Sequence, residues 1–195
     1  MRKLLAVIAF ALSITISHAQ TISYDDFKSI IPSLQKEDWS SAFNTSKNLL
    51  EAAPNDSSDF KAIVIYINIF SAAGMVTEGK MTYDELEQNI MKFKGQRILM
   101  SAHPVSENES NTLNQTMFSE IDSHFEGFTS ATNAKGTNIF CFEKFYFNDK
   151  LNLKKLKKSI VRCGGTLDKI ELNPNKSMIW IVRLTVTDAY VRIAN

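Results

Sequence analysis

The chain has 195 residues, of which 44% are hydrophobic, and its 22 Lys and Arg residues nearly balance its 21 Asp and Glu residues. This composition is ordinary for a folded globular protein and excludes disordered, collagen-like and low-complexity chains. The formal net charge of +1 gives no overall indication of a nucleic-acid or membrane-surface binder, and the length suits one domain or two small ones.

Residues 1–19 have the pattern of a cleaved secretory signal peptide. A basic start at Arg2 and Lys3 precedes an apolar stretch over residues 4–16, and Ala19 is the small residue expected before a cleavage site. The apolar stretch is too short to span a bilayer, which takes roughly 20 apolar residues. The alternative to a signal peptide is a buried N-terminal helix. We expect cleavage after Ala19 and a periplasmic or extracellular mature chain of 176 residues without a transmembrane segment.

Residues 20–94 are predicted to form antiparallel helical hairpins. Apolar residues recur at helical spacing in a first helix, which Pro32 should kink or break, and in a second that ends at Pro54. A third helix over residues 60–73 is apolar almost all round and should lie centrally; a buried strand is the competing interpretation, but the length favours a helix. Gly74 is its predicted C-cap. A capping box formed by Thr82 and Glu85 opens a fourth helix.

Part of this segment resembles a tetratricopeptide repeat. The sequence EDWSSA at 37–42, followed by LLEAAPND at 49–56, is similar to the second helix and exit turn of that repeat. Ala42 and Pro54 stand at its small-residue and proline positions, whereas Ser46 stands where a large residue is expected. Residues 60–74 and 82–91 would form the next helix pair. Because fewer than three repeats rarely stand alone, the resemblance implies a helical segment that leans on the rest of the chain.

Residues 95–195 are predicted to form five strands. We expect strands at 97–105, 125–132, 137–147 and 159–172, and a fifth around 178–187 whose even-numbered residues are buried. Gly164 and Gly165 indicate a bulge in the fourth strand. Residues 106–122 should be a long polar loop with one helical turn around 117–121, and residues 151–158 a short amphipathic helix. This order is that of an OB-fold, a partly open five-stranded barrel, so the predicted fold class is α+β.

The same segment resembles the tRNA-anticodon-like OB-fold family over about residues 95–190. The likeness rests on KGQRI at 94–98, IFCF at 139–142, and LKKLKK at 153–158 leading into IVRCGG at 160–165. That family includes exported bacterial members of unassigned activity, so the resemblance implies a fold and is nearly silent on function. The chain departs from the family by its long insertion at 106–124 and by lacking a lipid-accepting Cys after the signal peptide.

One group of residues in this segment is a candidate ligand site. OB-folds bind single strands through a cationic groove and aromatic stacking platforms on their second and third strands. The alternative is that the Phe residues fill the barrel while the lysines form a solvated helix face, and we favour that interpretation. The candidate residues are Phe128, Phe140, Phe142, Tyr146, Lys150, Lys154 and Lys155, within a basic cluster that runs to Lys158.

Catalytic and metal-binding patterns are missing from the sequence. It contains no P-loop, nucleophile-elbow, zinc-protease, dinucleotide-binding or EF-hand motif. His103 and His124 are the only histidines of the mature chain, and neither has partners at the spacing of a triad or a zinc site. We therefore expect no enzymatic activity, no cofactor and no metal.

Cys141 and Cys163 would form one disulfide in an oxidising compartment, or else remain two separately buried thiols.

The charge is divided along the chain, because residues 20–124 carry a net −7 and residues 125–195 a net +6. With the repeat-like helices and the missing catalytic residues, this division favours an exported, non-enzymatic binding or assembly module whose partner is a protein or a cell-envelope component. The alternative is an OB-fold that binds a ligand or single-stranded nucleic acid through the aromatic and lysine residues above. An extracytoplasmic location weakens the nucleic-acid hypothesis, and the oligomeric state does not follow from the sequence.

Overall fold

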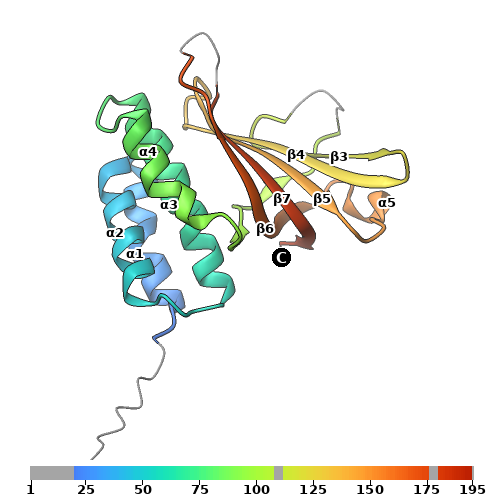
Figure 1. Cartoon of the computed structure of the whole chain (residues 1–195). Helices are drawn as coiled ribbons and strands as arrows, with labels where there is room; N and C mark the ends of the chain where they lie inside the picture. The colour runs from blue at the N-terminus through green and yellow to red at the C-terminus, as the bar shows by residue number, and fades with distance from the viewer. Residues whose placement is uncertain (1–19, 108–111, 176–179, 195) are drawn as a thin grey trace, which may run out of the picture.

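The computed structural model describes residues 20–107, 112–175 and 180–194, and it shows a layer of helices followed by a sheet (Figure 1). The helices are α1 (Tyr24–Gln35), α2 (Trp39–Ala52), α3 (Asp59–Thr77) and α4 (Tyr83–Ile90), and the 3-10 turn η1 (Met91–Phe93) leads out of α4. The strands are β1 (Arg97–Leu99), β2 (His103–Pro104), β3 (Thr116–Ile121), β4 (His124–Thr132), β5 (Ile139–Phe147), β6 (Ile160–Leu172) and β7 (Trp180–Ile193), with α5 (Leu153–Leu156) between β5 and β6. The fold is α+β, as predicted, and the predicted signal peptide lies outside the described residues.

Side-chain caps fix the start of each long helix. The capping residues Ser23, Asp38, Ser58 and Thr82 each accept a hydrogen bond from the backbone amide three residues ahead. These bonds satisfy amides that have no partner within the helix. The capping box predicted at Thr82 is confirmed, because the Thr82 amide also donates to the Glu85 carboxylate at 2.8 Å.

Helix α3 is the central element of the helical layer. It packs against α1, α2 and α4 and also against β1, β5 and β7. By length and composition it could cross a membrane, but 67% of that stretch is buried in the fold, which is typical of a core helix.

The prediction that Gly74 caps α3 is wrong, because the helix continues to Thr77. Gly74 is instead the place where the Trp39 ring of α2 approaches the α3 backbone. Pro32 does not break α1.

The strands form one open sheet of seven strands in the order β1-β6-β7-β5-β4-β3, with β2 also paired to β6. Neighbouring strands are antiparallel, except that β5 and β7 are parallel. The sheet is therefore not closed into the five-stranded barrel that the sequence predicts. The expected bulge is confirmed, since the register of β6 shifts between Gly164 and Thr166. A Cβ on Gly165 would lie 2.6 Å from the Thr187 carbonyl oxygen.

The structure has two more strands than the sequence predicts, and they come from two segments whose sequence pattern does not indicate them. The predicted strand at 97–105 is divided into β1 and β2. The prediction of a loop with a helical turn at 117–121 is wrong, because β3 pairs with β4 through a turn in which Asp122 and Ser123 have positive φ. Most side chains of β3 are half-buried or exposed, so the alternation that marks a strand is weak there. Helix α5 is also shorter than the predicted 151–158.

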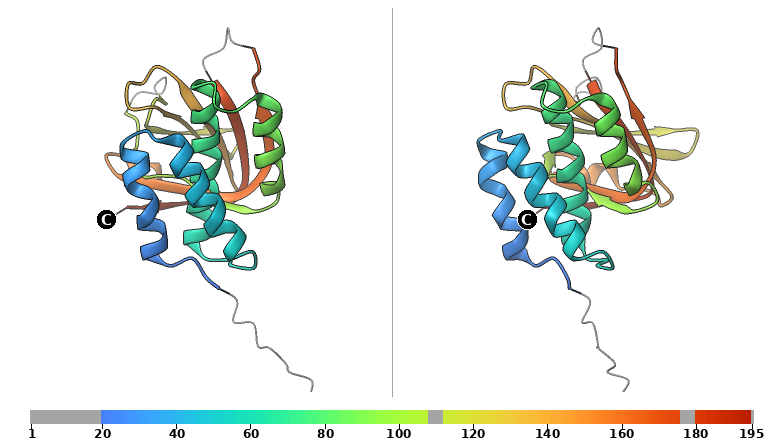
Figure 2. Two further views of the ribbon diagram at one scale, coloured as in Figure 1. Left: turned by 90° about the vertical axis from the view of Figure 1, so that its left-hand side faces the viewer. Right: turned by 60° about the vertical axis from the view of Figure 1, so that its left-hand side comes forward.

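One hydrophobic core joins the helices to the sheet, and Figure 2 shows the helical layer lying across the strands. Trp39 and Tyr66 from the helices belong to the same buried cluster as Phe140 of β5 and Leu184 of β7. The even-numbered residues of β7 from 182 to 186 are fully buried, as predicted, whereas Trp180 is half-buried and residue 178 of the predicted strand lies outside the described residues. Residues 20–94 and 95–195 therefore pack as two layers over a shared interior, and the candidate site lies where the layers meet.

Candidate functional site

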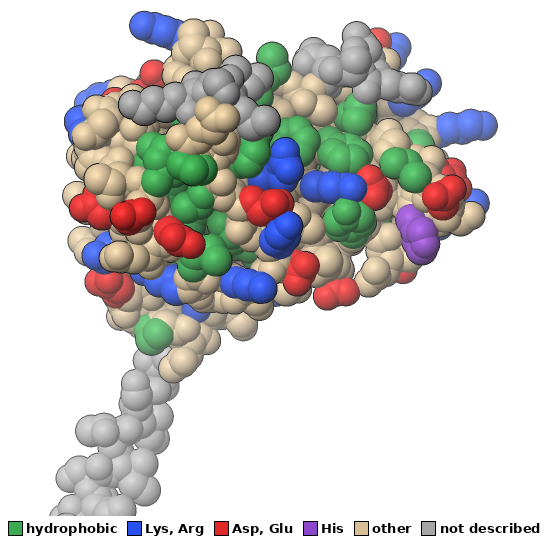
Figure 3. All heavy atoms as spheres, turned by 45° about the horizontal axis from the view of Figure 1, so that its top comes forward, with side chains coloured by type: hydrophobic (Ala, Val, Ile, Leu, Met, Phe, Trp, Pro, Cys, Tyr) green, Lys and Arg blue, Asp and Glu red, His purple; other side chains and the backbone are tan. Residues whose placement is uncertain are grey.

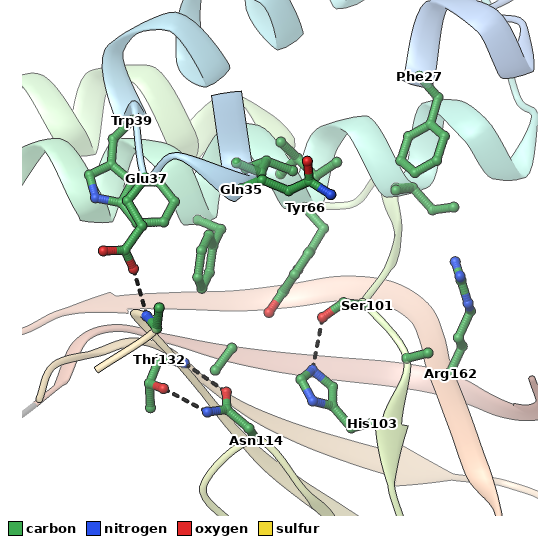
Figure 4. Close-up of a pocket in the computed structure, with 17 residues that line it drawn as sticks. Phe27, Gln35, Glu37, Trp39, Tyr66, Ser101, His103, Asn114, Thr132 and Arg162 are labelled. Carbon is green, nitrogen blue, oxygen red and sulfur yellow. Dashed lines mark hydrogen bonds between the residues drawn. The ribbon is translucent and has the colours of Figure 1, made fainter. Parts of the chain in front are cut away.

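A cavity of about 400 Å³ lies between the helical layer and the sheet (Figure 4). Side chains of α1, α2 and α3 line it from one layer, and β2, the end of β4, the start of β6 and loops next to β2 and β4 line it from the other. Its apolar lining consists of Phe27, Leu34, Trp39, Ile63, Ile67, Phe70, Ala102, Ala131 and Ala134. Its polar lining consists of Gln35, Glu37, Tyr66, Ser101, His103, Asn114, Thr132 and Arg162.

The aromatic end of the cavity is held in place by the turn between α1 and α2. Glu37 in this turn has a positive φ of 54°, and its carboxylate accepts a hydrogen bond from the Ala134 amide at 2.6 Å. Trp39 follows at the start of α2 and is only 5% exposed. Its ring meets Phe70 and Phe140 edge-on, with centroids 5.6 and 5.1 Å away. Both contacts are of the favoured T-shaped kind, so the Trp39 ring is packed on two sides by other aromatic rings.

The polar groups on the sheet side of the cavity are bonded to one another. Ser101 Oγ and His103 Nε2 are 2.8 Å apart. The Asn114 amide group donates to Thr132 Oγ1 at 2.7 Å, and its carbonyl oxygen accepts from the Thr132 backbone at 3.1 Å. Burial lowers the pKa of His103, against the opposing effect of a hydrogen bond to the Asn114 backbone, so the ring is neutral at neutral pH.

A buried acid lies beside the cavity. Tyr66 lines the cavity from α3 and donates a hydrogen bond to Glu143 Oε1 on β5 at 2.7 Å. Glu143 is fully buried, and its Oε2 has no hydrogen-bond partner within the described part of the chain. Burial raises the pKa of Glu143 to about 8 and the pKa of Tyr66 well above its usual range. Both groups are therefore predominantly uncharged at neutral pH, and the cavity has no charge on this side from Tyr66 or from the acid behind it.

Cys141 and Cys163 are two free thiols buried in the core. They lie on β5 and β6, and β7 runs between these strands in the sheet, so the disulfide alternative is not realised. Burial raises the pKa of both thiols. A thiol that stays protonated is a poor nucleophile, and we assign both cysteines to the packing of the core.

The predicted ligand-binding residues are separated by the structure. Phe140 is in the core because the register between β4 and β5 shifts opposite it, which places both Phe140 and Cys141 inward. Lys150, Lys154 and Lys155 are exposed in α5 and the loop that leads to it. These four residues do not line the cavity.

The other three predicted residues lie on the surface of the sheet that faces away from the core, and we call this surface the outer sheet face. Phe128 and Tyr146 lie on either side of Lys144, whose Nζ is 5.4 and 4.5 Å from their ring centroids. Phe142 has the Arg183 guanidinium over its ring at 5.6 Å. Figure 3 shows cationic, acidic and hydrophobic side chains interspersed over the sheet in this region. Each of these aromatic rings therefore already has a cation against its face.

No family model matches the chain, and no curated protein or solved structure matches it. The residues that the structure describes contain no group of three or more His, Cys, Asp and Glu that could hold a metal ion. Function must therefore be inferred from the geometry of the cavity and of the outer sheet face.

Proposed function

We propose that this protein is an exported, non-enzymatic binding module whose partner places an apolar group in the cavity between α1, α3 and the sheet. The observation that carries this proposal is the cavity itself. It measures about 400 Å³, and the surface of its walls is mostly apolar although polar side chains also line it; binding sites for small molecules are usually built in this way. A cell-envelope component with an aliphatic or aromatic part fits such a cavity best.

The finer assignment of the fold is part of the same proposal. If β1, β2 and β3 are taken as one interrupted strand, the strand order becomes that of an OB-like sheet, with α5 between the third and fourth strands. Helices α1 to α4 pack consecutively, Ala42 is fully buried and Pro54 follows the end of α2. These features support an OB-like sheet covered by repeat-like helices.

The Ser101–His103 pair is better explained as a bonded polar pair than as catalytic machinery. Besides Ser101, the group that acts on the His103 ring is the backbone of Asn114, which favours the charged form, whereas a serine hydrolase usually has a carboxylate that orients the imidazole and stabilises its charged form. Burial also disfavours the charged imidazole. This arrangement supports a binding role for the cavity.

Filling the cavity tests the proposal. Ala102 lines the cavity, so Ala102→Phe would occupy it, whereas Ala194→Phe adds the same ring beyond the end of β7 and outside the lining. An uncharged naphthylamine dye, followed by its fluorescence, should bind the wild type and Ala194→Phe equally. Ala102→Phe should bind it about tenfold more weakly, because the dye then buries less apolar surface. Equal dye affinity in all three proteins would contradict the proposal.

The outer sheet face supports a second candidate function, the binding of single-stranded nucleic acid or another planar ligand. The specific observation is that Phe128, Phe142 and Tyr146 share this face with Lys144 and Arg183, and aromatic rings with nearby cations are what stacked bases need. A base would first have to displace a cation from the ring. Titration with a thymidine oligonucleotide at low salt decides the matter: absence of binding there removes this candidate.

A further inference from the structure

The cavity between the helices and the sheet has opposite charges at its two ends. Glu37 lies at one end and Arg162, on β6, at the other (Figure 4). Glu37 is already engaged by the Ala134 amide. Arg162 as a residue is half-buried, and its guanidinium, in contrast, has no hydrogen bond or ion pair with any residue that the structure describes. One end of the cavity therefore has an uncompensated positive charge.

The neighbouring strands cannot neutralise Arg162. Its register partner on β7 is Arg192, and like charges opposite each other in a sheet repel. Arg192 pairs with Asp59 at the start of α3, and Arg97 of β1 binds the same carboxylate at 2.9 Å. Asp59 is thus shared by two of the three arginines, and the third is left at the cavity without a counter-ion from the described chain.

We infer that the ligand of this cavity is an anionic amphiphile, with its carboxylate or phosphate head paired to Arg162 and its aliphatic chain against the apolar wall. A guanidinium forms paired, charge-assisted hydrogen bonds with either kind of head. On the helical side of the cavity, this apolar wall includes Ile63 and Ile67 of α3. Glu37 repels a second anion at the far end, so the ligand has one orientation. This inference rests on the proposed binding function and specifies the class of ligand.

The experiment is a calorimetric titration at neutral pH with three probes of equal chain length: decanol, decanoate and decyl phosphate. The wild type should bind at least one anion about tenfold more tightly than decanol, which is a modest value for a charge-assisted pair in a partly solvated site. Arg162→Gln should lose this preference and keep its affinity for decanol. The matched control is Arg192→Gln, which removes the opposite cation on the neighbouring strand but lies outside the cavity lining, and it should keep the preference.

Two results would overturn the inference: anions that bind no more tightly than decanol, or an Arg162→Gln variant that binds all three probes more weakly by the same factor. If decanol itself does not bind the wild type, the cavity is not a ligand site and the proposed function fails as well. If decanol binds and Ala102→Phe abolishes its binding, but the anions gain nothing, only the inference about the head group fails. The tighter of the two anions identifies the head as a carboxylate or a phosphate.

Discussion

Glu143 is the residue whose burial has the clearest energetic consequence. One of its oxygens accepts from Tyr66, and the other has no partner among the residues that the structure describes. Burial raises its pKa to about 8, whereas an unfolded chain has a value of about 4.3. Between these values the folded protein holds a proton that the unfolded chain releases. The stabilisation from this proton is therefore complete at pH values below the pKa of the unfolded chain. It is lost as the pH rises from there through the pKa of the folded protein.

Glu143→Gln should remove this pH dependence. The free energy of unfolding of the wild type should fall by up to about 1.4 kcal/mol per pH unit between about pH 5 and pH 8 through this residue, and the variant should lack that contribution. Urea denaturation across this range gives the free energy of unfolding of both proteins at each pH. The difference between their slopes against pH is the contribution of Glu143, because the other ionisable groups contribute equally to both. Tyr66→Phe keeps the buried acid and should keep the slope. Identical slopes for Glu143→Gln and the wild type would show that the acid is not titrating in this range.

At the scale of elements, the contact between α2 and α3 depends on a glycine in the helix interior. A Cβ on Gly74 would lie 2.6 Å from Cγ of Trp39. The Trp39 ring has little room to move away, because Phe70 and Phe140 pack against it. The close approach of these two helices sets the position of Trp39 and hence the aromatic end of the cavity.

Gly74→Ala should have two opposing effects on the free energy of unfolding. Helix propensity alone would stabilise the variant by about 1 kcal/mol, but overpacking against Trp39 should cost about 1–3 kcal/mol, so we expect a net loss of stability in chemical denaturation. Ser71→Ala is the control on the same helix, because Ser71 Oγ is buried with no hydrogen-bond partner in the described part of the chain and its removal should not destabilise the fold. A Gly74→Ala variant more stable than the wild type would contradict the packing described here.

The elements that could be predicted are those whose signal is local. The capping box at Thr82, the central apolar helix α3 and the buried even-numbered face of β7 all follow from spacings of a few residues. Strand β3 was missed because most of its side chains are not buried. The candidate site could not be predicted, because Tyr66 and Glu143 meet across 77 positions of sequence. The isolation of Arg162 likewise depends on the register of β6 and β7.

At the scale of the whole molecule, the division into an acidic and a basic segment is not a division into independent bodies. The helices and the sheet share buried hydrophobic clusters, and polar contacts also cross between the layers, including Asp59 with Arg192 and Glu37 with Ala134. The cavity exists only because these layers meet, since its lining comes from both. A binding function located there therefore belongs to the complete fold and to neither segment alone.

The location of a bound apolar molecule tests this account most directly. Nuclear Overhauser contacts between decanol and the protein identify the protons that line its binding site. Decanol bound in the cavity should show contacts with the Trp39 indole and the Ala131 methyl group, both of which line the cavity. Contacts confined to Phe128 and Tyr146 on the outer sheet face, or no contacts at a saturating decanol concentration, would contradict it.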